Sequence, residues 1–209
     1  MKRYLVGCVA VLAVFAMAQT GGAAVSFDFN SGLQGWGSFG PITTDSGLHL
    51  TGGPDGSQSR WHVGDFDLAG WGMVDVSPVV NLTGLSKMSV DAKLTDPVPL
   101  DPYIGTKELE FMLVIGYAEW TKKVTLTSSY QTFSVDFVAL TPNYYASISP
   151  YFGALPALNN PALKIQLVMR NASGSGVGEL QYDNVNVTPE PASLALLGLG
   201  VIAAVRRRR

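Results

Sequence analysis

Cysteine and histidine, on which much enzyme chemistry depends, are almost absent from this chain of 209 residues. Cys8 is the only cysteine, and it lies in an apolar N-terminal stretch that we expect to be removed. Without Cys8 the chain has no thiol, which excludes disulfide bonds, thiol catalysis and metals held by cysteine. The two histidines, His49 and His62, sit between apolar residues and are predicted to lie in strands.

Catalytic motifs are also missing. The sequence contains no Gly-x-Ser-x-Gly elbow, no His-Glu-x-x-His pair and no glycine-rich phosphate loop. A glycosidase needs two carboxylates at a set separation, and the spacing of the glutamates selects no such pair. The available glutamates are Glu108, Glu110, Glu119 and Glu179. We therefore predict that the protein is not an enzyme, with a glycoside hydrolase as the outside alternative.

Basic side chains are scarce in the middle of the chain. Six of the 14 Lys and Arg residues lie in the two terminal segments, together with one of the 16 Asp and Glu residues. The middle therefore keeps 8 basic against 15 acidic side chains, a net charge of −7. An acidic domain binds nucleic acids and anionic lipids poorly, because both are negatively charged. We expect no nucleic-acid partner. The negative net charge of the middle region is better suited to solubility, or to binding cations or neutral polymers.

An apolar segment is present at each end. At the start, Lys2 and Arg3 precede an apolar run over 4–18, and small residues follow. This is the layout of a secretory signal peptide. We predict a signal peptide over 1–24, with cleavage after Ala18 or Ala24, and hence export.

The second apolar segment closes the sequence, with Pro189-Glu190-Pro191 before it and four arginines after it. The largely apolar segment 192–205, 14 residues long, would make a helix of roughly 21 Å, shorter than the ~30 Å hydrocarbon core. Arginine side chains can reach the headgroups and keep that end in the cytoplasm. We therefore predict a membrane helix over 192–205 with the folded part outside the inner membrane. An ordinary tail anchor is the alternative.

This order of motif, helix and arginines resembles the PEP-CTERM sorting signal of Gram-negative, biofilm-forming bacteria, which a membrane-embedded cysteine transpeptidase called exosortase processes. The resemblance covers 188–209. It implies that Pro189, Glu190 and Pro191 are the recognition motif. The membrane anchor that it implies is Arg206, Arg207, Arg208 and Arg209. It further implies exosortase and the export machinery as partners, a transient inner-membrane anchor, and a final place at the cell surface or outside the cell.

The middle region, 25–187, has the size of one domain and a pattern typical of an all-β fold. Apolar and polar residues alternate along three stretches, which predicts half-buried strands. The stretches are 88–94, 133–137 and 163–169. Residues 111–117 are apolar on both faces, which predicts a central strand, and 121–123 are predicted to turn the chain into a strand near 124–127. Gly, Pro, Asn and Ser punctuation favours a β-sandwich.

Three short segments near the ends of this region carry a second resemblance: Phe27-Asp28-Phe29-Asn30, Gly35-Trp36 and Leu180 to Val185. They resemble the jelly-roll sandwiches of the galactose-binding-like and carbohydrate-binding-module group. The resemblance implies a single jelly-roll-like β-sandwich whose first and last strands lie together and share a structural calcium ion. The implied ligands are Asp28, Asn30 and Asp183, with Asn30 standing where the group commonly has Glu.

The residues around Asp183 give an independent reason to examine it. Leu180 and Tyr182 share one strand face, whereas Val185 lies on the other, so the inward face changes at Asp183-Asn184. A β-bulge would cause that change, and an acidic residue beside Asn is a reasonable ligand set for a hard cation. The alternative is that Asp183 caps a turn or bonds to neighbouring backbone N–H groups.

Sugar binding needs an aromatic ring for the apolar face of a pyranose and polar groups for its hydroxyls. We expect Trp36 in the core. The best exposed candidates are Trp120, at a predicted hairpin end, and Tyr144 and Tyr145 in the long connection 141–161. For each of them, packing in the core or on the surface is the alternative.

Together these features predict a protein of the cell surface or extracellular matrix, sorted by an exosortase, with a non-catalytic structural or matrix-associated role. The alternative is a calcium-stabilised carbohydrate-binding module for extracellular polysaccharide, in which calcium is the only cofactor.

Overall fold

The computed structural model describes residues 23–39, 43–65, 73–95, 106–171 and 177–189. The predicted signal peptide up to residue 22, and the sorting segment from Glu190 to Arg209, lie outside these ranges. Within the described ranges, no helix combines the length and the apolar character that a membrane crossing needs.

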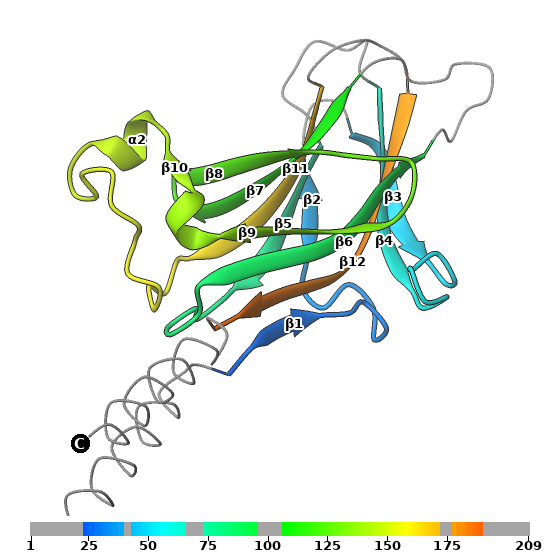
Figure 1. Ribbon diagram of the computed structural model, residues 1–209, viewed down its shortest axis with the longest axis horizontal. Coiled ribbons are helices and arrows are strands. Elements are labelled where there is room, and N and C mark those ends of the chain that lie inside the picture. Colours follow the sequence, from blue (N-terminus) through cyan, green and yellow to red (C-terminus); the bar gives the residue numbers. More distant parts are fainter. Residues whose placement is uncertain (1–22, 40–42, 66–72, 96–105, 172–176, 190–209) are drawn as a thin grey trace, which may run out of the picture.

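The strands form two antiparallel sheets that pack face to face (Figure 1). Sheet A has the order β3-β4-β12-β6-β9, and β1 pairs with the last part of β12. Sheet B has the order β10-β8-β7-β11-β5-β2. The strands of sheet A are β1 (Val25–Phe27), β3 (Thr43–His49), β4 (Ser59–Asp65), β6 (Lys87–Thr95), β9 (Gln131–Asp136) and β12 (Val177–Thr188). Those of sheet B are β2 (Gly37–Phe39), β5 (Met73–Val79), β7 (Lys107–Ile115), β8 (Ala118–Thr125), β10 (Thr141–Pro142) and β11 (Lys164–Asn171). The predicted all-β sandwich is confirmed.

Two short helices, η1 (Phe137–Ala139) and α2 (Tyr144–Ser147), interrupt the β structure. The core lies between the sheets and is built by alternating strands, because every second side chain of a strand points to the same face. From β6 and β11 it receives Met88, Val90, Ala92, Leu94, Ile165, Leu167 and Met169. The predicted strands over 88–94 and 163–169 are therefore confirmed. The third stretch is strand only to Asp136, because Phe137 opens η1.

Strand β7 is central in sheet B, and its part over 111–115 is apolar on both faces as predicted, whereas 116–117 form the turn that follows it. Its inward side chains include Phe111, whereas Met112 and Val114 belong to a second buried cluster on the opposite face. The predicted turn at 121–123 is wrong, because these residues lie inside β8. The turn is Gly116-Tyr117, where Gly116 supplies a φ of 60° that side-chain-bearing residues adopt less readily.

A polar network centred on the buried Asp75 joins the two sheets. Arg60 Nε lies 3.1 Å and His62 Nε2 lies 2.6 Å from Oδ2 of Asp75, which comes from the facing strand β5. The Tyr182 hydroxyl donates to the same oxygen, and Arg60 also donates to the Ser38 hydroxyl. Both histidines lie in strands, as predicted. His62 is therefore held in the interior as a structural residue.

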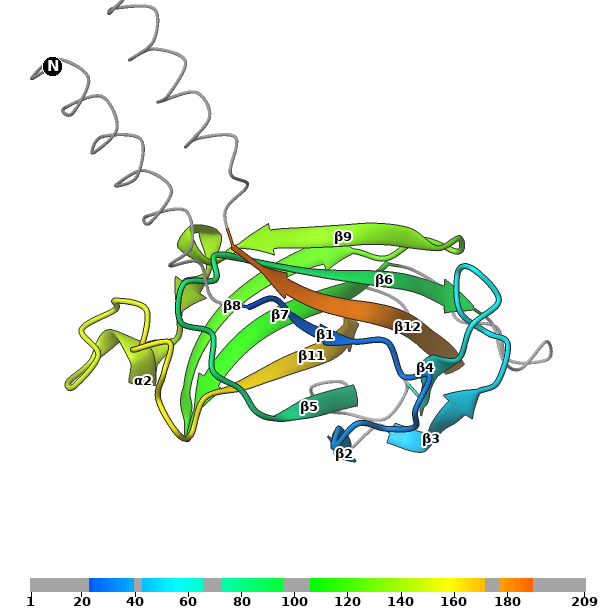
Figure 2. The same cartoon turned by 90° about the horizontal axis from the view of Figure 1, so that it is seen from below.

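The first and last strands lie side by side, as the second resemblance implied. Val25 pairs with Val187 and Phe27 with Val185. The carbonyl of Thr188 accepts a hydrogen bond from Ser86 N at 3.0 Å, so β12 is paired up to its final residue. Figures 1 and 2 show β1 beginning and β12 ending at the same end of the sandwich, which also carries α2.

Candidate functional site

Three tyrosine rings form an exposed cluster beside α2, and we call them the tyrosine platform. Tyr117, Tyr144 and Tyr145 are 83%, 72% and 54% exposed. The ring centroid of Tyr145 lies 6.0 Å from that of Tyr117 and 5.5 Å from that of Tyr144. Such edge-to-face and tilted contacts are favourable for aromatic rings, so the three side chains support one another without being buried.

Asn143 fixes the backbone under the platform. Its Oδ1 accepts hydrogen bonds from Ala146 N at 2.9 Å and Glu119 N at 3.2 Å, so it caps α2 and holds β8 at once. Its Nδ2 donates to the carbonyl of Tyr117 at 3.1 Å. Because one side chain joins α2 to the β7–β8 turn, Tyr144 and Tyr145 are placed next to Tyr117.

Glu119 adds a carboxylate beside the platform. Its Oε2 accepts a hydrogen bond from Asn143 Nδ2 at 3.3 Å. Burial raises the pKa of the Glu119 carboxyl, and the nearby charge of Glu110 raises it further. The Asn143 amide is fully used inside the protein, so the platform offers ring faces beside the Glu119 carboxyl group, and sugar recognition uses both kinds of group.

The prediction that Trp120 is exposed is wrong. Trp120 is fully buried in the core and contacts Tyr151 edge to face, with centroids 5.2 Å apart. The cause is the position of the turn: with Gly116-Tyr117 as the turn, Ala118 and Trp120 share the inward face of β8. Trp36 is buried, as expected.

The predicted β-bulge is confirmed. The pairing of β12 with β6 shifts register between Asp183 and Asn186, and Asn184 has a φ of 50°. The bulge turns Asp183 into a buried position, where Oδ2 accepts from Ser57 Oγ at 2.9 Å and Oδ1 from Asn184 N at 2.7 Å. Burial raises the pKa of the Asp183 carboxyl, and the nearby charges of Asp55 and Asp91 raise it further.

The calcium set of Asp28, Asn30 and Asp183 stays a prediction. Asn30 Oδ1 accepts from Gln58 N at 3.3 Å, next to the Ser57 that contacts Asp183, so these two candidates converge on one loop. Asp28 is engaged in its own turn, where Gln34 Nε2 donates to Oδ1 at 2.8 Å and lowers the Asp28 pKa. All three offer the oxygen ligands that calcium prefers. Among the described residues, no three His, Cys, Asp or Glu side chains gather as a metal site.

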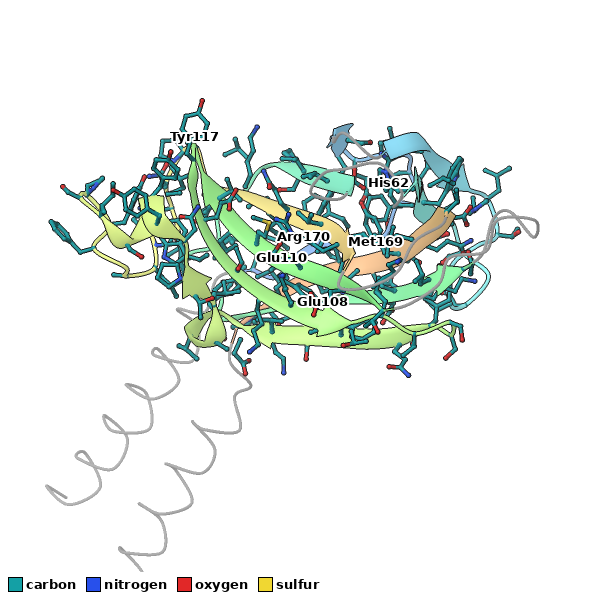
Figure 3. The ribbon with its side chains drawn as sticks, turned by 90° about the horizontal axis from the view of Figure 1, so that it is seen from above. His62, Glu108, Glu110, Tyr117, Met169 and Arg170 are labelled. Atoms are coloured by element: carbon teal, nitrogen blue, oxygen red, sulfur yellow. The ribbon has the colours of Figure 1, made fainter. Side chains whose placement is uncertain are left out.

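The glutamates considered for catalysis are divided between the two sheets. Glu110 pairs with Arg170 and Glu108 with Lys123 on the outer face of sheet B. Figure 3 shows Glu108 and Glu110 on β7, with Arg170 on the neighbouring strand β11. Glu179 lies in sheet A, 3.2 Å from His49 Nε2. Glu179 is therefore separated from the others, and the two on β7 are held in ion pairs.

Sequence reasoning missed Tyr117 and Asn143. The apolar pattern predicts that the strand continues through Tyr117, although the Gly before it is a signal for a two-residue turn. Asn143 directly precedes the run Tyr-Tyr-Ala-Ser, and Asn is a favoured N-cap residue. Of the predicted sorting motif, Pro189 is the last described residue, and Glu190, Pro191 and 206–209 lie beyond the described ranges.

Comparison with known proteins finds a sorting motif at the C-terminus and a fold similarity for the rest of the described chain. Residues 187–209 match the PEP-CTERM protein-sorting motif. The C-terminus therefore carries this sorting signal, which indicates export and exosortase-dependent placement at the surface or outside the cell. No curated protein matches the sequence.

The folded part is similar to solved carbohydrate-binding modules. The family 11 module of the cellulosomal cellulase Lic26A-Cel5E of Clostridium thermocellum is 16% identical, with a TM-score of 0.59 over 80% of this chain and 95% of that one. A family 11 module of the same organism, in complex with a β-1,3-1,4-mixed-linked tetrasaccharide, is 19% identical, with a TM-score of 0.58 over 79% and 95%. The CBM22-1 xylan-binding domain of Paenibacillus barcinonensis Xyn10C is 12% identical, with a TM-score of 0.50 over 82% and 99%. The chain therefore has the jelly-roll fold of these modules.

Proposed function

We propose that this protein is an exported, non-catalytic module that binds extracellular polysaccharide through the tyrosine platform. The fold that it shares with carbohydrate-binding modules supports this class of function. The observation that carries the proposal is the platform itself, in which three exposed rings touch on a backbone fixed by Asn143. Until exosortase acts, the segment 192–205 holds the protein at the inner membrane.

The chemistry of the platform suits a neutral sugar chain. The C–H face of a pyranose stacks on a tyrosine ring, and its hydroxyls bond to phenol or carboxyl groups. The rings are already ordered by their own contacts, so binding loses less side-chain freedom. The acidic charge of the domain favours neutral over anionic polysaccharides, and we expect an affinity that depends little on salt.

Affinity electrophoresis in gels containing the matrix polysaccharide of the producing strain tests the proposal. The double variant Tyr144→Ala/Tyr145→Ala is expected to bind roughly tenfold more weakly, since each ring contact contributes about 0.5–1.5 kcal/mol. The matched control is Leu50→Ala, because Leu50 is 74% exposed and belongs to the connection after β3, away from the platform. Equal retardation of the double variant and the wild type contradicts the platform as the site.

A structural role in the matrix, without direct sugar contact, is the second candidate. The sorting signal favours it, because export to the matrix does not require polysaccharide binding. Wild-type protein that shows no retardation on any matrix polysaccharide would support this role and overturn glycan binding.

We further propose that Asp28, Asn30 and Asp183 hold a calcium ion that stabilises the fold and does not touch the glycan. The support is the convergence of Asn30 and Asp183 on the loop at Ser57 and Gln58. A chelator is then expected to lower Tm, because calcium binds only the folded state. A Tm that is the same with calcium and with chelator contradicts this set.

A further inference from the structure

Exposed apolar side chains gather at one end of the molecule. Of the nine large hydrophobic side chains that are exposed in the described residues, six lie on the β7–β8 turn and in the segment 138–152. We call these six the apolar rim: Tyr117, Val138, Tyr144, Tyr145, Ile148 and Phe152. A concentration of this kind on the surface of a domain marks an interaction surface.

The rim begins beside the point at which the sorting signal leaves the domain. Ser86 N donates to the carbonyl of Thr188 at 3.0 Å, and Ser86 O accepts from Phe137 N at 2.7 Å. Phe137 opens η1, whose next residue, Val138, is 88% exposed. The backbone of Ser86 thus connects the end of β12 to the start of the rim. Figures 1 and 2 place α2 at the same end of the sandwich.

The bilayer must lie close to this end before processing. Only residues 189–191 separate Thr188 from the apolar segment 192–205, and three residues span at most about 10 Å. Val25, which follows the predicted signal peptide, pairs with Val187 at the same place. Both membrane-directed segments therefore join the domain at the end that carries the rim.

The chemistry of the rim matches the interface of a bilayer. Tyrosine is enriched at the headgroup level, and Val, Ile and Phe side chains bury readily in the acyl boundary. Lys87 and Asp136 beside the exit form a pair at 3.9 Å, so their charges offset each other where the domain would face the headgroups. A short tether also gives an effective concentration on the order of millimolar, at which weak partition suffices.

We propose that the apolar rim rests on the outer surface of the inner membrane while the sorting segment is attached, and that separation from this segment exposes the tyrosine platform to polysaccharide. The second half rests on the proposed function. The occupant of the rim is thus a lipid surface, and because the platform tyrosines belong to the rim, the protein does not engage matrix polysaccharide before it is sorted.

The docking half can be tested on the full chain in phosphatidylcholine vesicles. In a Cys8→Ser background the chain has no other cysteine, so Val138→Cys, Phe152→Cys and Leu50→Cys each accept a single fluorophore. Lipids brominated near the headgroup are expected to quench the label at 138 and 152 several-fold more than the label at 50. Equal quenching at all three positions, or none at 138 and 152, overturns docking.

The gating half is tested with Val138→Asp/Phe152→Asp, which leaves the platform tyrosines in place. In vesicles, this variant is expected to bind polysaccharide several-fold better than the wild type, because its rim no longer docks. Equal binding by the two vesicle-bound proteins overturns gating. If neither protein binds polysaccharide in vesicles or in detergent, the proposed function fails, and the quenching result then decides docking separately.

Discussion

The molecule contains two aromatic clusters with similar ring geometry and opposite surroundings. Phe27, Phe29, Trp36 and Tyr182 touch at centroid distances of 5.4–6.1 Å inside the sandwich. The tyrosine platform has contacts of 5.5 and 6.0 Å, yet it is open to solvent. The buried cluster has a sheet on each side, whereas the platform is held mainly by Asn143. Ring contacts alone therefore do not distinguish a core from a binding surface, and the distinction lies in the backbone behind them.

The largest difference is expected from removing one ring of the buried cluster. Trp36→Ala should lower the free energy of unfolding by about 3–5 kcal/mol, because it leaves a cavity between the sheets. Tyr144→Ala should change it by less than about 0.5 kcal/mol, because the ring is exposed. Urea unfolding of both variants measures the two values. A similar loss in both would mean that the platform is part of the core.

A smaller effect is expected at the support of the platform. Asn143→Ala should cost about 1 kcal/mol, because α2 loses its N-cap, and should weaken polysaccharide binding although all three tyrosines remain. Asn81→Ala is a suitable control, since Asn81 also caps a short turn, through Thr83 N at 3.0 Å, far along the chain from the platform. Urea unfolding and affinity electrophoresis report the two effects. Unchanged binding in Asn143→Ala would show that the rings need no fixed backbone.

The polar residue next to the buried cluster should respond to pH. The folded-state pKa of Asp183 is raised above its ordinary value of 3.8, chiefly by burial. Its contribution to stability is therefore fully present below that value and is lost as pH rises through the raised pKa. The Asp183→Asn variant should not lose stability in this way. The Tm of the variant relative to the Tm of the wild type should therefore increase as pH rises from about 4. A Tm difference that is constant with pH would contradict the raised pKa.

The effect of calcium on Tm tests the role of Asp183 in a second way. Added calcium should raise the Tm of the wild type at neutral pH, because the ion compensates the buried charge, and should leave Asp183→Asn unchanged. An equal rise in both proteins would place any calcium elsewhere.

The smallest effect is expected from removing one hydroxyl of the platform. Tyr145→Phe keeps the ring and its contacts with Tyr117 and Tyr144, so stability should stay within about 0.5 kcal/mol of the wild type. Polysaccharide binding should be largely retained, because stacking uses the ring face. A loss as large as that of the double alanine variant would show that the hydroxyl, rather than the face, recognises the sugar.

Local pattern predicted the strands and the bulge well. Alternation along β6 and β11 is a property of a few neighbouring residues, and the change of face between Tyr182 and Val185 predicted the bulge at Asp183-Asn184 directly. The turn at Gly116-Tyr117 was missed because apolar residues continue through it, whereas Thr121-Lys122-Lys123 looks like a polar turn. That single error in register also placed Trp120 on the surface.

Long-range pairing could not be predicted from the sequence. Asp75 meets Arg60 and His62 only because β5 faces β4 across the core, and no spacing along the chain encodes that meeting. The platform likewise depends on contact between the β7–β8 turn and α2, which lie 26 residues apart at Asn143 and Tyr117. Of the candidate site, the sequence supplied Tyr144 and Tyr145, and the fold added the rest.

The pairing of β12 up to Thr188 also has a mechanical consequence. Strand β12 is central in sheet A, with β4 and β1 on one side and β6 on the other. Its hydrogen bonds run perpendicular to the strand. A pull transmitted through the sorting segment along the strand axis therefore loads these bonds in shear, all at once, instead of peeling them one by one. Such a pull is borne by the middle of the sheet instead of by an edge strand.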